Sequence, residues 1–268
     1  MPKNKFQNCF NFKCFGFEID LAFELLILNF FYYYNYIITA NKTNDNLWKN
    51  IAAGAKELFF PKQCFFCKKY GYLLCDDCES LLDVCPAHRP DRDRKYLTDI
   101  YSACSFENKF VKKMIYSFKY EPLWRDLGAP LSELVVNHFS LSEQNFDRDD
   151  SVIIPVPLAK KRLRWRGFNQ AEIIARNLGR QWQIPVAPDC LARTRDTDPQ
   201  AELSQARRQK NINGAFACAD NALFENKSVC LVDDVVTTGA TMEECARVLL
   251  AGKARQVTGV SIARTERP

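Results

Sequence analysis

The stretch that decides the fold is VCLVDDVVTTGAT, residues 229–241. It begins with an apolar run, Val229 to Val232, of the kind found in parallel strands that are covered on both faces. Asp233 and Asp234 follow this run, and a turn with hydroxyls and a glycine comes next. Because ligands of open α/β sheets bind beyond the carboxyl ends of parallel strands, the two acids are the first candidates for a binding site.

The residues after this turn predict a helix. Thr241 and Glu244 have the spacing of a capping box, and apolar side chains then recur at helical spacing until Gly252. The first amides of a helix and the positive end of its dipole favour an anion such as a phosphate. Carboxylates would repel that phosphate, so the two acids are better suited to accept hydrogen bonds from sugar hydroxyls, with a divalent cation nearby. These features together indicate a site for ribose, phosphate and Mg²⁺.

Length and composition fit an intracellular α/β protein with a small additional module. A chain of 268 residues can hold a domain of about 170 to 200 residues and a smaller unit. A net charge of +5 is mild for this length and does not by itself indicate nucleic-acid binding. Four of the twelve cysteines form two C-x₂-C pairs, which favours metal binding in a reducing cytosol over disulfides. We therefore expect a cytoplasmic protein.

The two cysteine pairs predict a structural zinc site. Their pattern is C-x₂-C-x₇-C-x₂-C, formed by Cys64, Cys67, Cys75 and Cys78. Four thiolates complete a closed tetrahedral shell that leaves no open catalytic position. Cys85 and His88 are alternative ligands in case one of the four sulfurs is not used, and the sequence does not decide between these sets. So short a segment buries little apolar surface, so its folding should depend on the metal.

The first 46 residues differ from the rest in composition. They are rich in Phe, Tyr and Asn, and residues 25–40 are free of charge but shorter than the roughly 20 residues of a spanning helix. An extension without a defined function and a misplaced translation start are favoured over membrane contact. We divide the chain into this extension (1–46), a zinc-binding module (47–90) that opens with a predicted helix, and a main domain (91–268).

Two basic segments lie between the cysteines and the acids. Residues 152–157 predict a strand, and five cationic side chains with Trp165 among them follow in a predicted loop, residues 158–166. Such a loop suits a pyrophosphate, or, with its aromatic ring, a nucleic-acid backbone. The second segment, residues 193–211, is polar and contains Pro199, which favours either a loop that closes over a ligand or a plain surface linker.

Residues 229–241 resemble the phosphoribosyl pyrophosphate (PRPP) motif of type I phosphoribosyltransferases. From about residue 47 to the end, the chain also resembles the ComF family, which includes ComFC and GntX proteins. The resemblance rests on the cysteine module and on three further motifs, which are Pro155 to Leu158, Arg166 to Ala171, and Arg193 to Arg195 with Gln200, Arg207 and Asn211. It implies a type I phosphoribosyltransferase-like α/β fold, a parallel sheet flanked by helices, preceded by a small zinc-binding module.

The resemblance also implies roles for individual residues. The catalytic residues would be Asp233, Asp234, Arg193 and Arg207. PRPP would be bound by both acids and by Val235, Thr237, Thr238, Gly239, Ala240, Thr241, Pro157, Leu158, Arg166, Asn169, Gln170 and Gln200. The cofactors would be Mg²⁺, which accompanies PRPP, and a structural Zn²⁺.

We therefore expect a phosphoribosyltransferase that moves the phosphoribosyl group of PRPP to a nitrogen nucleophile, a nucleobase-like acceptor, with release of pyrophosphate. Two alternatives stay open. One is a non-catalytic regulator that senses PRPP or a nucleotide. The other is a competence accessory that binds single-stranded DNA or competence proteins.

Overall fold

The computed structural model describes residues 62–87, 90–91, 94–195 and 212–265. The extension at 1–46 and the helix expected before the cysteines lie outside these ranges, as do His88, Gln200 and Arg207. Among the helices within these ranges, none has the length and apolar character needed to cross a bilayer.

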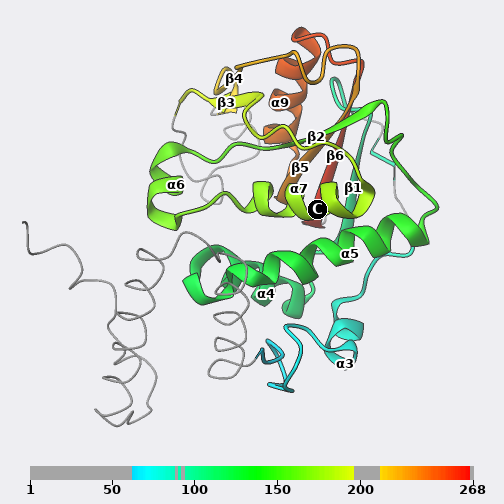
Figure 1. Cartoon of the computed structure of the whole chain (residues 1–268), viewed down its shortest axis with the longest axis vertical. Coiled ribbons are helices and arrows are strands. Elements are labelled where there is room, and N and C mark those ends of the chain that lie inside the picture. The colour runs from blue at the N-terminus through cyan, green and yellow to red at the C-terminus, as the bar shows by residue number, and fades with distance from the viewer. Residues whose placement is uncertain (1–61, 88–89, 92–93, 196–211, 266–268) are drawn as a thin grey trace, which may run out of the picture. The chain divides into compact units, whose positions relative to one another are not determined.

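The centre of the fold is a four-stranded sheet in which every pairing is parallel (Figure 1). Its order is β1-β6-β5-β2, with β1 at Asp99–Ser105, β6 at Gln256–Arg264, β5 at Ser228–Val236 and β2 at Ser151–Pro155. After α7 (Gln170–Trp182), the chain adds a bridge between Val186 and Ile153 beside β2. The predicted parallel α/β fold is thus confirmed.

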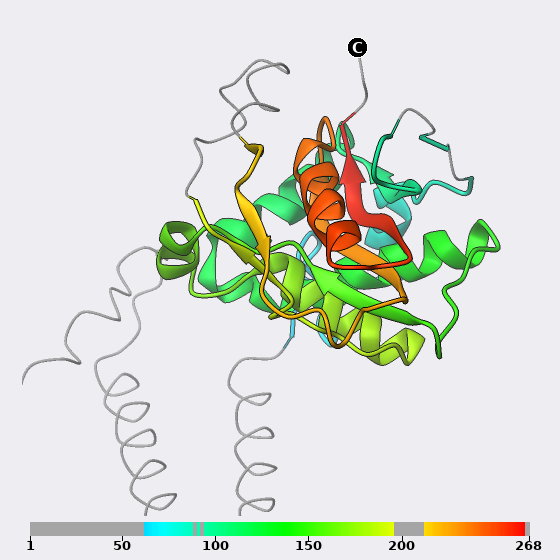
Figure 2. The same ribbon diagram turned by 90° about the horizontal axis from the view of Figure 1, so that it is seen from above.

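Helices cover both faces of the sheet, which explains the continuous apolar strands (Figure 2). Cys230 and Val232 of β5 pack into one core with α4 (Lys109–Tyr120), α5 (Gly128–Leu141) and α7 (Gln170–Trp182). Val229 and Leu231 point the other way, into a core with α9 (Ala240–Ala251). This alternation is the period of two that a strand imposes.

Shorter elements complete the main domain. A six-residue 3₁₀ segment, η3 (Pro122–Leu127), joins α4 to α5, and a two-stranded antiparallel hairpin of β3 (Leu191–Arg193) and β4 (Phe216–Cys218) contributes to the α9 core. The basic stretch after β2, expected as a loop, contains the short helix α6 (Lys160–Arg166). Gly167 ends α6 in the left-handed region at φ 80°, a conformation that glycine adopts without strain.

The cysteine segment shares its core with the main domain. It contains α3 (Asp76–Glu79) and the 3₁₀ turn η2 (Ser80–Leu82). Phe65 and Leu82 belong to the core of α4 and α5, and the Phe65 ring packs edge-on against Trp124 with centroids 4.8 Å apart. The Cys85 amide also donates to the carbonyl of Ala103 on β1 at 2.8 Å. The division of the chain at residues 46 and 90 stays a prediction.

The predicted capping box at the start of α9 is wrong. Gly239 is the N-cap, at φ 80°, and both Thr241 and Glu244 lie inside the helix. The left-handed glycine lets the chain enter the helix two residues earlier than the pattern suggested. Glu244 instead accepts a hydrogen bond from the Gly214 amide at 2.8 Å. The predicted end of the helix before Gly252 is confirmed.

Candidate functional site

Asp233 and Asp234 stand at the edge where the sheet loses a strand. β2 ends at Pro155, opposite Val232, while β5 continues beside β6, with Asp233 opposite Ser261. Both acids therefore lie beyond the carboxyl end of β2 and are only partly buried. The amide of Asp234 donates to Oδ1 of Asp233 at 2.8 Å, which orients that carboxylate.

Lys119 contacts the site, although sequence reasoning did not identify it. Its Nζ lies 2.8 Å from Oδ1 of Asp234, and the exposed fractions of the two side chains are 19% and 13%. Lys119 is in the last turn of α4. No motif marks this residue, because the helix has other lysines, Lys112 and Lys113, that are exposed. Only the packing of α4 under β5 selects it.

The electrostatics of the pair favour a ligand that donates hydrogen bonds or carries positive charge. Burial, reinforced by the neighbouring Asp234 carboxylate, raises the pKa of Asp233 to about 7. Lys119 and Arg193 act in the opposite direction on the same pKa. Ribose hydroxyls or a nearby divalent cation would therefore stabilise the ionised Asp233.

We expect Asp233→Asn to stabilise the folded protein at pH 8 by about 1–3 kcal/mol and to have little effect near pH 4. The folded pKa of about 7 lies above the ordinary value of 3.8, so the cost of ionising Asp233 in the fold grows as the pH rises between these values and is complete above them. The asparagine keeps an acceptor for the Asp234 amide. Urea unfolding at both pH values measures the difference.

The matched control is Asp234→Asn, which removes the partner of Lys119 and should destabilise the fold. Equal destabilisation by Asp233→Asn at pH 4 and pH 8 would contradict the assigned environment of Asp233.

Arg166 and Gln170 present buried donors beside these acids. Arg166 ends α6, and its Nη1 donates to Oε1 of Gln170 at 2.6 Å. Burial lowers the pKa of Arg166, and the charge of the nearby Asp234 partly offsets this effect. Within the described residues, Nε of Arg166 and Nε2 of Gln170 are buried and have no acceptor. A buried donor without an acceptor costs about 1–3 kcal/mol, so this pair indicates an anionic ligand.

The other predicted residues of this region surround the same edge. The Asn169 side chain caps α7 through the Ala171 amide at 3.2 Å and donates to the Val156 carbonyl at 3.0 Å. Pro157 and Leu158 lie partly buried between β2 and α6. The structure thus gathers side chains from β5, α6 and α7 at one end of the sheet.

The turn that opens α9 follows the acids directly. Val235 closes β5 together with Val236, and the partly buried Thr237 and Thr238 lead to Gly239. The hydroxyl of Thr238 lies 3.4 Å from the Ala240 amide. The first amides of α9, including that of Thr241, lie at the amino end of the helix, which attracts anions.

Arg193 reaches the site from the hairpin. It lies on β3 with its guanidinium 5.3 Å from the centroid of the Phe216 ring, and its charge lowers the pKa of Asp233. Of the four residues expected to be catalytic, Asp233, Asp234 and Arg193 therefore lie within electrostatic reach of one another. Arg207 lies outside the described residues.

The four cysteines form a separate cluster. The sulfur atoms of Cys64, Cys67, Cys75 and Cys78 all lie within 4.8 Å of one another. A tetrahedral zinc with bonds of about 2.3 Å holds its sulfurs about 3.8 Å apart, so the spacing fits this metal. Cys64, Cys75 and Cys78 are buried, and Cys67 is exposed.

The thiols of this cluster differ in their pKa values. Although burial opposes ionisation, hydrogen bonds from the amides of Cys67, Cys75 and Phe66 lower the pKa of Cys64 to about 6. Burial and hydrogen bonds with the neighbouring sulfurs raise the pKa of Cys78 to about 12. A bound Zn²⁺ would favour all four thiolates. Cys85 lies outside this cluster, and its charge acts on Cys104 instead.

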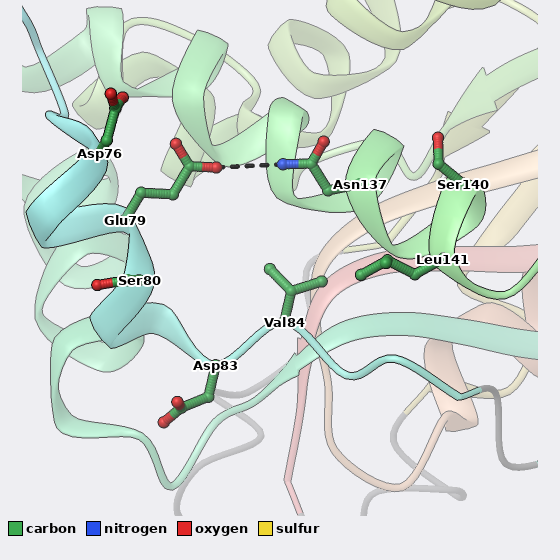
Figure 3. A pocket seen from close by; sticks show the side chains of 8 residues that line it. All are labelled: Asp76, Glu79, Ser80, Asp83, Val84, Asn137, Ser140 and Leu141. Carbon is green, nitrogen blue, oxygen red and sulfur yellow. Dashed lines mark hydrogen bonds between the residues drawn. The ribbon is translucent and has the colours of Figure 1, made fainter.

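A groove of about 520 Å³ lies beside the second cysteine pair and away from Asp233 and Asp234 (Figure 3). It runs between the cysteine segment and α5, and Nδ2 of Asn137 donates to Oε1 of Glu79 across it at 3.1 Å. Asp76, Glu79 and Asp83 make its lining acidic, and it contains none of the residues expected to bind PRPP. The groove is therefore unsuited to a phosphate.

The comparisons with known proteins agree with the geometry. Residues 163–267 match the model of the phosphoribosyl transferase domain. Competence protein F of Haemophilus influenzae is 29% identical over 212 residues, which cover 71% of this chain and 92% of that protein. DNA utilization protein YhgH of Escherichia coli O157:H7 is 36% identical over 113 residues, 42% of this chain and 49% of that protein.

Competence protein ComFC of Bacillus subtilis is 32% identical over 115 residues, 42% of this chain and 45% of that protein. The chain thus matches about half the length of the last two relatives. Among solved structures, the allosteric regulatory enzyme of purine biosynthesis aligns with 50% of this chain and 26% of its own, with a TM-score of 0.35 and 18% identity.

Proposed function

We propose that this chain, a ComF-family protein with a phosphoribosyl transferase domain, binds PRPP with Mg²⁺ and transfers the phosphoribosyl group to a nitrogen nucleophile. The carrying observation is the group of side chains at the carboxyl end of β5. There the Asp233–Asp234 pair, the α9 turn and the donors of Arg166 and Gln170 lie together. The two carboxylates can accept hydrogen bonds, while the amides of the turn and the N–H groups of Arg166 and Gln170 can bind anions.

Each part of PRPP has a matching group in this arrangement. The two carboxylates accept hydrogen bonds from the ribose hydroxyls, and Lys119 holds Asp234 in position. The amides at the start of α9 bind the 5′-phosphate. Arg166 and Gln170 donate to the pyrophosphate, whose negative charge grows as it leaves C1′. Asp233 and Asp234 would help to hold Mg²⁺ together with PRPP, and the ion would supply further positive charge for the leaving group.

Pyrophosphate departure and attack by the acceptor nitrogen require preorganised charge more than a covalent nucleophile. Arg193 adds a cation on the hairpin side. The loop role expected for residues 196–211, with Gln200 and Arg207, stays a prediction.

Calorimetry with PRPP and Mg²⁺ tests the binding step, and pyrophosphate release across a panel of nucleobases tests catalysis. Binding of PRPP together with release of pyrophosphate identifies a transferase. Binding without release from any base favours the PRPP-sensing regulator, and no binding contradicts the proposal. The acceptor class, a cytoplasmic location and a place in DNA uptake are parts of the same proposal, the last supported by the names of the relatives.

A specific surface favours a second function, binding of single-stranded DNA. Tyr116, Tyr120 and Trp165 are 60%, 44% and 68% exposed, and they form a row with ring centroids 4.6 and 5.8 Å apart. The two helices that carry these rings, α4 and α6, also carry exposed cations, which are Lys112, Lys113, Lys160, Lys161 and Arg164. Stacking rings beside cations are the features that bind single strands without reading their sequence.

We expect the double substitution Tyr116→Ala, Trp165→Ala to weaken binding of a single-stranded oligonucleotide at least about tenfold, because stacking contributes about 1–3 kcal/mol per base. The salt dependence should stay, since the cations remain. Filter binding over a salt series measures both. Tyr70→Ala, which removes another exposed ring that is 65% exposed, is the matched control. Equal affinities of the double variant and the control would contradict this function.

A further inference from the structure

A residue far away in sequence packs on the turn that opens α9. Nη1 of Arg94 donates to the carbonyl of Thr238 at 2.8 Å, across 144 residues of chain. The Arg94 side chain is only 7% exposed. A Cβ added to Gly239 would come within 2.6 Å of Nη1 and within 2.8 Å of Nη2. The guanidinium therefore lies directly against the glycine of the proposed phosphate turn.

An ionic anchor holds Arg94 in this place. Oδ2 of Asp91 accepts from Nε of Arg94 at 2.9 Å and from Nη2 at 2.7 Å. Asp91 also pairs with Arg264, which ends β6. Although burial opposes ionisation, the hydrogen bonds from Arg94 and Arg264 hold the pKa of Asp91 below its ordinary value. Two donors of one guanidinium that share a buried carboxylate oxygen fix the orientation of its plane.

Arg94 retains capacity for one more partner. A guanidinium has five N–H donors, and three of those of Arg94 take part in the bonds to Asp91 and Thr238. The other two are on Nη1 and Nη2, the atoms beside Gly239. Near them are the amides of the first turn of α9, which favour negative charge.

We propose that Arg94 is the positioning residue for the 5′-phosphate, an inference that rests on the proposed function. It holds the Thr238 carbonyl so that the turn keeps its amides toward the phosphate, and its remaining N–H groups add positive charge there. Gly239 leaves room for the guanidinium, because a Cβ at this position would displace it.

Calorimetry with ribose 5-phosphate, inorganic pyrophosphate and PRPP, each with Mg²⁺, tests this role. Arg94→Ala is expected to weaken binding of ribose 5-phosphate and PRPP roughly tenfold to a hundredfold and to leave pyrophosphate binding within about twofold. Arg94→Lys keeps the charge but cannot bond Asp91 and the Thr238 carbonyl through separate nitrogens, so its affinities should fall between those of the wild type and the alanine variant.

Arg255→Ala is the matched control, because Arg255 pairs with an aspartate, Asp150, at the amino end of the strands. It should leave all three affinities unchanged. Unchanged ribose 5-phosphate binding in Arg94→Ala would overturn the inference, and so would an equal loss for pyrophosphate, which indicates a general structural role. If the wild type itself binds no PRPP, the proposed function fails, and this inference fails with it.

A second measurement tests the contact without any ligand. Gly239→Ala should lower the melting temperature less in the Arg94→Ala background than in the wild type, because the clashing guanidinium is absent. Strain from the positive φ is common to both backgrounds and cancels. Additive effects of the two substitutions would show that Arg94 does not lie against Gly239 in solution, and would overturn the inference.

Discussion

Replacing Asp233 and Asp234 together by asparagine is expected to weaken PRPP binding about a hundredfold or more. Each hydrogen bond to a charged group contributes about 1.5–3 kcal/mol, and the proposed site makes at least two of them to the ribose hydroxyls. Asparagine preserves the shape of each side chain, so the loss reports charge and acceptor strength. Calorimetry with PRPP and Mg²⁺ measures it.

The control for this double variant is Asp150→Asn, which removes an aspartate paired with Arg255 at the opposite end of β2 and β5. Its affinity for PRPP should match that of the wild type. A double variant that still binds PRPP with wild-type affinity would show that the carboxylates do not hold the ribose. Circular dichroism of both variants separates this result from a loss of fold.

If the four cysteines hold zinc, its removal is expected to destabilise the whole protein by several kcal/mol, a large part of the about 5–15 kcal/mol that stabilises a typical domain. The cysteine segment buries Phe65 and Leu82 in the core beside α4 and α5, so its unfolding would expose apolar surface of the main domain as well. Thermal unfolding with and without a strong chelator measures the effect.

Cys64→Ser is expected to lose the zinc and to melt at least about 10 °C below the wild type. Cys85→Ser is the matched control, because Cys85 belongs to the same segment but lies outside the four-sulfur cluster. Atomic absorption should find one zinc per chain in the wild type and in this control. Zinc loss in Cys85→Ser would contradict the four-cysteine set, and zinc retained by Cys64→Ser would contradict it as well.

The sequence was sufficient wherever a local pattern determines the structure. The apolar run of β5 and the spacing of Ala171, Ile174 and Leu178 in α7 identified a buried parallel strand and an amphipathic helix, because burial imposes these periods on neighbouring residues. The four cysteines were identified for the same reason, since two short knuckles bring sulfurs together. The capping box failed because Gly239, a residue without a side chain, begins α9 through its backbone conformation.

The missing parts of the candidate site are contacts between distant segments. Lys119 meets Asp234 only because α4 packs against the end of β5, and Arg94 meets Thr238 only because its segment runs past the α9 turn. Lysines and arginines are frequent in this chain, so residue type alone does not distinguish these two from the exposed ones.

By itself, the sequence determined the parallel sheet, the acids at the end of a strand, the turn that follows them and the cluster of four cysteines. The tertiary structure alone decided which cations face these groups, and it raised the pKa of Asp233 by burying the carboxylate beside a second one. The physical reason is the distance along the sequence over which each interaction acts. Periodicity and turn chemistry act over a few neighbouring residues, whereas charge pairing and burial depend on which distant segments the packed core brings together.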